Sequence, residues 1–289
     1  MVPIGMMRSM SGAFARPELL ATVDWVAEHI PRQSVRLLDC RWRPDQTAHR
    51  LFAAAHIPGA VFLDWMASLV DQTDATPLQL ADPDRFAAAM GQSGVGDGAT
   101  VVCYDDTGSL FASRVWWGLQ TYGVASARVL DGGWPAWVAS GRPSTTAQVA
   151  VEPATFTPRL DPRRRLSTSE VRGLIGSSDV DLVDARAPAD YAGRQGDAAR
   201  LGRLPAAVNV PASLLTAEDG QHFLAPEALS TIFGRAGLSR ERRVVVYDSA
   251  GIGASKVALA LNLVGFPDVA VYDGGWAEWG ARMDLPVNR

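Results

Sequence analysis

Residues 244–248 read VVVYD, and residues 101–105 read VVCYD. Three further blocks recur in the same order: 35–41 (VRLLDCR) with 180–186 (VDLVDAR), 56–61 (HIPGAV) with 203–208 (RLPAAV), and 129–134 (VLDGGW) with 271–276 (VYDGGW). The paired blocks are separated by 142 to 147 residues. Four ordered blocks at a nearly constant separation indicate a tandem duplication of one structural unit.

Each half alternates short apolar runs with helical patterns. In the second half, residues 181–184 (DLVD) have the pattern of a buried strand bounded by charge, and residues 244–247 and 269–272 are short apolar runs typical of buried strands. Residues 256–265 carry helix-forming residues with an apolar stripe and a terminal Gly, and Ser167–Glu170 has the pattern of a capping box. Strands that alternate with helices predict an α/β fold, with a mainly parallel sheet flanked by helices in each half.

The length of 289 residues agrees with two domains. We expect a first domain over residues 18–140 and a second over residues 166–289. Residues 141–165 contain Pro, Thr and a run of three Arg at 163–165 but little periodicity, so they are expected to form a linker with a solvated basic end. Residues 1–17 lack the uninterrupted apolar stretch of a secretory leader and are expected to be a frayed or disordered tail.

The composition excludes several classes of protein. The net charge is −4, with 27 basic and 31 acidic residues, so no sequence-wide basic field attracts nucleic acid or anionic lipid. No stretch is apolar enough for a membrane span. The chain has two Cys and four His without metal-ligand spacing, so neither a metal, a cofactor nor a disulfide framework is expected. These counts favour a soluble protein of the reducing cytoplasm.

Two loops that connect a strand to a helix are candidates for chemistry, because ligands of parallel α/β sheets bind at the carboxyl ends of the strands. They are residues 105–112 (DDTGSLFA) and 248–255 (DSAGIGAS). After its first residue the second loop is Gly-rich and mostly small, and it continues with Ser249, Ala250, Gly251, Ile252 and Gly253. Successive N–H groups of such a loop can point at one spot, and the helix that follows adds positive potential. The second loop is therefore predicted to be an anion cradle.

The repeat, the loops and the DGGW blocks together resemble the tandem-domain rhodanese family, which includes thiosulfate and 3-mercaptopyruvate sulfurtransferases. The resemblance extends from about residue 18 to the C-terminus, and the motifs that carry it are LDCRW (38–42), HIPGA (56–60), ASRVWW (112–117), LDGGW (130–134) and YDGGWAEW (272–279). It implies that the second domain holds a loop whose first residue is a catalytic Cys. That Cys takes a sulfane sulfur as a persulfide and passes it to a thiophilic acceptor.

This chain departs from the family at the first residue of that loop, which is Asp248. No Cys occurs after position 103, so no shift of alignment restores the nucleophile. Persulfide chemistry needs a polarisable thiolate, which a carboxylate does not replace. Asp248 also places a negative charge where an anionic substrate would bind. The first half of the family normally carries Asp here and is not catalytic, and Asp105 follows that pattern.

Other positions near the predicted cradle also differ from the family. Residues 187–193 (APADYAG) carry Asp190 where family members commonly have an Arg that holds the substrate anion, which leaves Arg194 or Arg200 as substitutes. Residues 202–207 (GRLPAA) lack the His and the second Gly of the family's GHIPGA block. Asp64 matches a family residue that faces the interdomain cleft, either as a polar interface residue or as a ligand contact.

Each candidate residue has a structural alternative. Asp248 is expected to cap its own loop by accepting the N–H groups of the cradle, although a role as an acid or base in another reaction remains open. Ser249 and Ser255 lack an identifiable base, so neither is favoured as a nucleophile. Cys103 is expected to be a small buried hydrophobe. Cys40 follows a strand on the functional side of the sheet, so an accessory redox or sulfur-carrying role remains open.

Two functions therefore follow from the sequence. In the first, the chain is a catalytically degenerate member of the family that serves as a binding, regulatory or scaffold protein, with a small anion, a sulfur compound or another protein as its partner. In the second, it is a weak or altered sulfurtransferase that moves sulfane sulfur from thiosulfate or 3-mercaptopyruvate to an acceptor.

Overall fold

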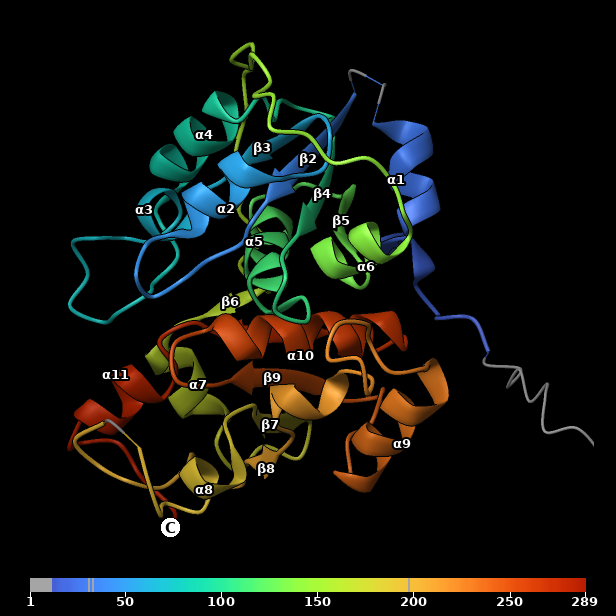
Figure 1. The fold of residues 1–289 in the computed structure, drawn as a ribbon. Coiled ribbons are helices and arrows are strands. Elements are labelled where there is room, and N and C mark those ends of the chain that lie inside the picture. Colours follow the sequence, from blue (N-terminus) through green and yellow to red (C-terminus); the bar gives the residue numbers. More distant parts are fainter. Residues whose placement is uncertain (1–11, 31, 33, 197) are drawn as a thin grey trace, which may run out of the picture.

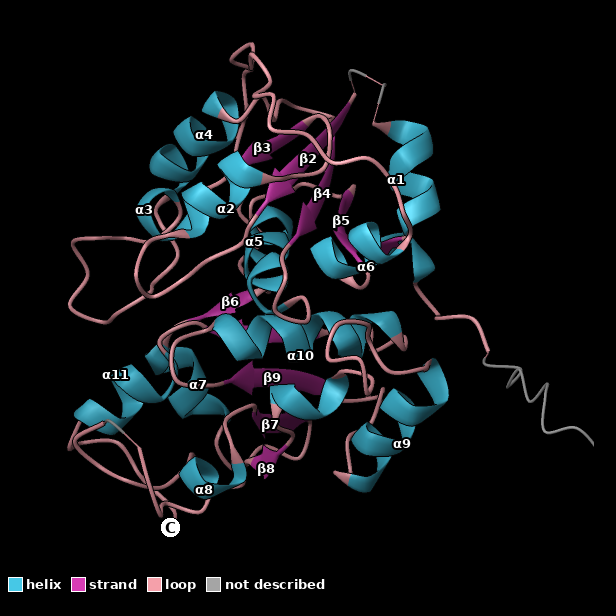
Figure 2. Ribbon diagram, in the orientation of Figure 1, coloured by secondary structure: helices cyan, strands magenta, loops and turns pink. Residues whose placement is uncertain are grey.

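The computed structural model describes residues 12–30, 32, 34–196 and 198–289, and it contains two halves stacked on one another (Figure 1). Each half is a five-stranded, wholly parallel sheet with helices on both faces (Figure 2). The α/β class predicted from the alternating pattern is confirmed.

The first half has the strand order β1-β5-β4-β2-β3. Its strands are β1 (Leu20–Ala21), β2 (Val35–Asp39), β3 (Ala60–Phe62), β4 (Thr100–Tyr104) and β5 (Ala127–Leu130). Its helices are the 3-10 turn η1 (Pro17–Leu19), α1 (Val23–His29), α2 (Ala48–Ala54), α3 (Trp65–Ser68), α4 (Pro83–Gln92), α5 (Leu110–Thr121) and α6 (Gly133–Ala139).

The second half repeats this order as β6-β10-β9-β7-β8. Its strands are β6 (Arg165–Leu166), β7 (Val180–Asp184), β8 (Val208–Asn209), β9 (Arg243–Tyr247) and β10 (Val269–Tyr272). Its helices are α7 (Thr168–Leu174), α8 (Pro188–Tyr191), the 3-10 turn η2 (Ala212–Leu215), α9 (Pro226–Arg235), α10 (Ile252–Leu263) and α11 (Gly275–Ala281). The matching strand order confirms the duplication, and Asp105 and Asp248 each follow the central strand of their sheet.

The elements predicted in the second half agree closely with the structure. The strand at 269–272 is confirmed to the residue, the other two strands begin one residue earlier than predicted, and the capping box of Ser167 and Glu170 is present. The predicted helix at 256–265 corresponds to α10, which begins four residues earlier and ends two residues earlier. It begins early because Gly251 adopts a left-handed conformation (φ +85°) at the helix start.

Helices α5 and α10 lie side by side between the two sheets and form the centre of the interface (Figure 1). Every residue of α10 from Gly253 to Leu263 is buried, because the helix has its own sheet on one side and α5 on the other. One cluster of buried apolar residues runs through this interface and includes Trp116 of α5 and Leu261 of α10. The two halves therefore share a core.

Residues 140–164, between α6 and β6, cross the surface of the first half. The Ala154 N–H donates to the Gly91 carbonyl, and the Arg159 N–H donates to that of Tyr122. The run at 163–165 is only partly solvated. Arg163 is exposed, but the Arg165 guanidinium lies 3.1 Å from Asp273, so the expectation of a solvated run is wrong for Arg165.

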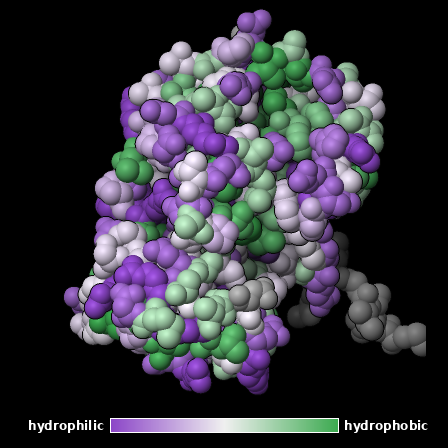
Figure 3. Space-filling view, turned by 90° about the vertical axis from the view of Figure 1, so that its left-hand side faces the viewer, coloured by the Kyte–Doolittle hydropathy of each residue, from purple (hydrophilic) through white to green (hydrophobic). Residues whose placement is uncertain are grey.

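The expected frayed tail falls partly on residues 1–11, which lie outside the described residues. In the described remainder, Phe14 packs against the shared core and the Arg16 N–H donates to the Leu263 carbonyl. Figure 3 shows hydrophilic and hydrophobic residues interspersed over one face. None of the described helices has the length and apolar run needed to cross a bilayer.

Candidate functional site

A buried Asp–Arg–Tyr cluster fixes the carboxyl ends of the strands in the second half. Asp184 ends β7 and accepts a bidentate pair from Arg186, with Nη2 at 2.6 Å. The Tyr247 hydroxyl donates to the same carboxylate at 2.6 Å and accepts the Leu204 N–H. The Arg186 guanidinium also lies 4.6 Å from the ring of Trp276. These contacts join β7 to β9 and to the 202–204 loop directly below the predicted cradle.

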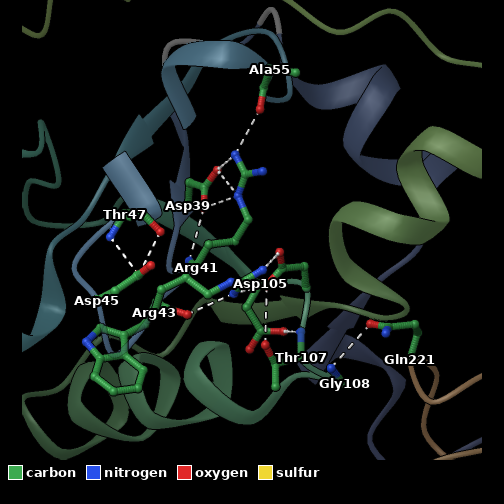
Figure 4. Close-up of polar contacts among 12 residues, drawn as sticks. Asp39, Arg41, Arg43, Asp45, Thr47, Ala55, Asp105, Thr107, Gly108 and Gln221 are labelled. Carbon is green, nitrogen blue, oxygen red and sulfur yellow. Dashed lines mark hydrogen bonds and ion pairs between the residues drawn. The ribbon is translucent and has the colours of Figure 1, made fainter. Parts of the chain in front are cut away.

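The first half has the same cluster, built from Asp39, Arg41 and Tyr104. Figure 4 shows the bidentate pair of Asp39 and Arg41, with Arg41 also donating to the Ala55 carbonyl. Because both halves keep this cluster, we assign it to the scaffold of the repeated unit and not to chemistry of one half.

Asp248 occupies the centre of its own loop. One carboxylate oxygen accepts the N–H groups of Ala250 (3.1 Å) and Gly251, and the other accepts that of Gly253 at 2.7 Å. The side chain is 8% exposed. The N–H groups that the sequence assigns to an anion cradle therefore already have a carboxylate as their acceptor, as a structural cap would provide.

Two opposing effects act on this carboxyl group. Burial raises the pKa of Asp248, while the hydrogen bonds from Gly251 and Gly253 and the positive charge of Arg114 lower it, and the net displacement is upward. The backbone fits closely around the group. A Cβ at Gly251 would lie 2.4 Å from Nη1 of Arg114, so only Gly fits between the loop and the interface.

Asp105 in the first half is held in the same way. Its two oxygens accept four N–H groups, from Thr107, Ser109, Phe111 and Ala112, at 2.7 to 3.0 Å. Burial raises its pKa as well. The loop of the second half therefore has the arrangement of the half that the family resemblance identifies as non-catalytic.

A buried ion pair links the two halves next to this loop. Nη1 of Arg114 on α5 lies 2.6 Å from Asp273, and both side chains are almost fully buried. The other oxygen of Asp273 accepts the Leu80 N–H at 2.8 Å and lies 3.1 Å from Arg165. Asp273 is thus contacted by three donors: Arg114 and Leu80 come from the first half, and Arg165 comes from β6 at the edge of the second sheet. The two donors of the first half fix its position over the second half.

Three further sequence candidates lie on α8 or in the segment between α8 and β8. Arg200 donates to the carbonyls of Trp279, Gly280, Arg282 and Leu285 at the end of α11, so it caps that helix and does not replace the family's anion-binding Arg. Arg194 is exposed in the loop after α8. Asp190 is half-buried and accepts from Gln195 at 3.2 Å.

Asp64 caps α3 by accepting the Ala67 N–H at 3.1 Å. It also lines a cavity of about 460 Å³ in the first half, together with Arg41, Trp42 and Trp65. Every residue that lines this cavity belongs to the first half.

The remaining candidates are two Cys thiols and two Ser hydroxyls. Cys40, directly after β2, and Cys103, on the neighbouring strand β4, are fully buried, and burial together with the adjacent Cys103 thiol raises the pKa of Cys40 well above its ordinary value. The Ser255 hydroxyl donates to the Gly251 carbonyl at 2.6 Å, and Ser249 is exposed at the rim of the loop. Within the described ranges, no three His, Cys, Asp or Glu residues gather as a metal site.

Sequence reasoning missed two residues of this region. Arg114 was seen only as part of a motif, although it forms the buried pair with Asp273. Lys256, which the sequence analysis places only at the start of a helix, lies on α10 beside an interdomain cavity. A signal was present in both cases, since each is a charged residue inside an otherwise apolar helix.

The chain is similar to known proteins in both sequence and structure. A rhodanese-like domain model matches residues 22–140 and again residues 167–282. The chain is 33% identical over 271 residues to 3-mercaptopyruvate sulfurtransferase of Escherichia coli K12, covering 91% of this chain and 95% of that protein. It is 34% identical over 275 residues to thiosulfate sulfurtransferase of Rattus norvegicus, covering 91% and 92%. Among solved structures, the 3-mercaptopyruvate sulfotransferase SseA of Escherichia coli matches with a TM-score of 0.82 and 30% identity over 89% of this chain and 98% of that one.

Proposed function

The chain belongs to the thiosulfate and 3-mercaptopyruvate sulfurtransferase family of tandem rhodanese-like proteins, and from this premise we propose that it has lost the persulfide step and acts as a binding, regulatory or scaffold protein. The observation that carries the proposal is the carboxylate of Asp248 inside its own loop, bonded to the N–H groups of Ala250, Gly251 and Gly253.

Two physical arguments support the loss of sulfur transfer. A carboxylate oxygen is neither polarisable nor thiophilic, so Asp248 does not accept a sulfane sulfur as a thiolate does. The same carboxylate uses the three N–H groups that would otherwise hold an anionic donor, and its charge opposes a second anion beside it. We therefore propose that Asp248 and residues 249–253 form a closed remnant of the family's active-site loop.

The alternative, a weak sulfurtransferase, needs another thiol. Cys40 is the candidate, because it follows β2 on the side of the sheet where the loops lie. Its side chain is 0% exposed and its pKa is raised by burial, so at neutral pH the thiol is protonated and closed to solvent. These properties favour the proposal over the alternative.

We propose a ligand or partner role because the scaffold around the loop is retained. The Asp–Arg–Tyr clusters, the shared core and the Arg114–Asp273 pair are all present, and a cavity lies between the halves. We propose domains at 18–140 and 166–289, with 141–165 as their connection. The two unpaired thiols, one directly after β2 and the other on the neighbouring strand β4, support residence in the reducing cytoplasm.

A cyanolysis assay tests the proposal. Thiosulfate and 3-mercaptopyruvate are each offered with cyanide, and thiocyanate is measured for the wild type, a heat-killed control and the Cys40→Ser variant. We expect thiocyanate formation by the wild type to equal that of the heat-killed control with both donors. Turnover above that control overturns the proposal, and its loss in Cys40→Ser establishes the accessory-thiol alternative.

A further inference from the structure

The cavity of about 460 Å³ lies within the first half, and Asp248 and residues 249–253 do not line it. Its lining residues come from the segments 41–49 and 62–67, which begin at the carboxyl ends of β2 and β3, and from Gln72. The carboxyl ends of the strands are where parallel α/β sheets bind ligands, and the volume suits a small molecule. The side chains of the lining therefore decide what this cavity holds.

Part of the lining is aromatic. Trp42 and Phe62 are half-buried, so each ring keeps some contact with the cavity and with solvent. The ring of Trp42 lies 6.3 Å from that of Trp65 and 5.4 Å from that of Phe111, and these neighbours fix its position. The face of an aromatic ring attracts a cation, and Trp does so most strongly. The aromatic lining thus favours a positively charged ligand.

The charged side chains of the lining leave one carboxylate uncompensated. Arg41 is paired with Asp39, and Arg43 with Asp106, each at 2.6 Å. One oxygen of Asp64 caps α3, and the side chain is exposed. Over the described residues, Asp64 takes part in no ion pair. The two Arg cations are therefore balanced within the protein, and the Asp64 carboxylate is not.

Carboxylates also outnumber the cation of Arg43. Asp106 forms the ion pair, and Asp45 and Asp105 act on Arg43 through their charges. Asp45 is exposed, and hydrogen bonds from Thr47 lower its pKa, so it is charged at neutral pH (Figure 4). The surroundings of the cavity therefore add negative charge to that of Asp64.

The internal repeat separates these side chains from the common scaffold. The halves align on Asp39 and Asp184, which end β2 and β7 and pair with equivalent residues of β3 and β8. At the three positions that give the cavity its aromatic and acidic character, the second half has small or apolar residues. The pairs are Trp42 and Ala187, Asp64 and Pro211, and Trp65 and Ala212. The site is therefore a property of the first half alone.

Trp65 contributes an unused donor. Its ring lines the cavity, stacks on Phe111 at 5.6 Å and is 1% exposed. Its indole N–H has no acceptor among the residues that the structure describes. A buried donor without a partner is rare in proteins, and water or a ligand commonly supplies the acceptor. The N–H of Trp65 is thus a built-in reporter of what enters the cavity.

We propose that this cavity binds one small organic cation, a guanidinium or a primary ammonium compound, with the Asp64 carboxylate as its counter-ion and the rings of Trp42 and Phe62 as its apolar contacts. The second carboxylate oxygen of Asp64 accepts N–H donors of the ligand. The carboxamide oxygen of Gln72, whose nitrogen donates to backbone carbonyls, is a further acceptor. The inference goes beyond the proposed function, because it concerns another site and a ligand of opposite charge to thiosulfate or 3-mercaptopyruvate.

Solution NMR tests the binding directly. Full-length protein labelled with ¹⁵N-Trp gives indole N–H signals, and the variants Trp42→Phe and Trp65→Phe assign the two signals of the cavity. Ethylguanidinium and propylammonium are titrated at constant ionic strength and below denaturing concentrations, with neutral ethylurea, which has the shape of ethylguanidinium, as the matched control. We expect a saturable shift of both signals with ethylguanidinium, which identifies a guanidinium ligand, or with propylammonium, which identifies an ammonium ligand. A non-saturating response to both cations, or an equal response to ethylurea, overturns the proposal.

Calorimetry on variants assigns the binding to named side chains. Asp64→Asn removes the charge and keeps the helix cap, because Asn caps helices as well as Asp does. It should weaken the affinity for the cation that saturates the signals by about tenfold or more, as for loss of a charge-assisted contact. Trp42→Leu should weaken this affinity by about twofold or more through loss of the aromatic face.

Asp82→Asn is the matched control, because Asp82 caps α4 in the same way and does not line the cavity. It should bind the cation as the wild type does. Unchanged affinity in Asp64→Asn or in Trp42→Leu, or an equal loss in Asp82→Asn, refutes the inference. Thiocyanate formation by the wild type would refute the loss of sulfur transfer and leave this result untouched, so the two failures are distinguishable.

Discussion

Replacing Asp248 with Ala tests what the carboxylate does in its loop. The change removes the acceptor of three N–H groups, those of Ala250, Gly251 and Gly253. A buried N–H left without any acceptor costs about 1–3 kcal/mol. Truncation also opens space that water or an anion can enter, and it removes a buried charge. We therefore expect a loss of only ~1 kcal/mol in the free energy of unfolding, as for a lost helix cap.

The repeat offers a matched comparison, Asp105→Ala. Asp105 accepts four N–H groups and is 1% exposed, against 8% for Asp248, so solvent replaces it less readily. We expect its loss to be larger, roughly 2–3 kcal/mol. Urea unfolding monitored by Trp fluorescence measures both variants against the wild type. Sulfate should restore stability to Asp248→Ala more than it stabilises the wild type, because only the variant has a vacated cradle.

The pH dependence has a definite sign. Because burial raises the native pKa of Asp248, the native carboxyl binds its proton at a higher pH than the unfolded chain does. The stability of the wild type relative to Asp248→Ala should therefore fall as the pH rises from about 3.9, the ordinary Asp value, through the native pKa. Calorimetric titration with thiosulfate completes the test. Equal affinity for the wild type and for Asp248→Ala would show that the carboxylate does not close the cradle, and the reasoning would be refuted.

Three further predictions concern the scaffold and the interface. Tyr247→Phe removes the hydroxyl that donates to Asp184 and accepts the Leu204 N–H, so it should lower stability by about 1–3 kcal/mol in urea unfolding while the ring keeps its packing. Arg114→Met removes one positive partner of the Asp273 carboxylate, so it should lower the free energy of unfolding by about 3–5 kcal/mol, as expected when one partner of a buried ion pair is removed. A loss below about 1 kcal/mol would mean that the charge of Asp273 is compensated without Arg114. Burial lowers the pKa of Lys256 from 10.5 to about 8. The stability of the wild type relative to Lys256→Gln should therefore rise by up to roughly 3 kcal/mol between these two pH values, because the unfolded chain keeps its proton longer than the native protein does. A flat or falling stability difference would contradict a lowered pKa for Lys256.

The architecture was predictable from the sequence because it depends on local pattern and on repetition. The run at 269–272 is apolar at every position and becomes β10 without a change of bounds. The equivalence of Asp105 and Asp248 followed from the repeated VVxYD block alone. The start of α10 was not predictable, because Ile252-Gly253-Ala254-Ser255 has no strong helical preference and Gly251 sets the helix start through its left-handed backbone.

The contents of the site were only partly predictable, because they depend on how the two halves meet. Arg200 was a reasonable candidate for an anion ligand, yet its guanidinium reaches the carbonyls that end α11. Arg165 belongs to a basic run but pairs with Asp273. Lys256 becomes notable only when α10 packs against α5 and leaves its ammonium group beside a cavity. Each of these contacts joins segments far apart in the sequence. The pattern marks Lys256 as a charged residue inside an otherwise apolar helix, but neither composition nor periodicity identifies what any of these three side chains contacts.

The most direct test of the central claim is the mass of the intact wild-type protein after incubation with 3-mercaptopyruvate or thiosulfate, without reductant. A sulfurtransferase of this family must carry the transferred sulfur on a protein thiol before any acceptor is present. The account predicts that the mass is unchanged with both donors, because the loop begins with Asp248 and the two thiols are buried. A gain of one sulfur atom, mapped by peptide analysis to Cys40 or Cys103, would contradict it.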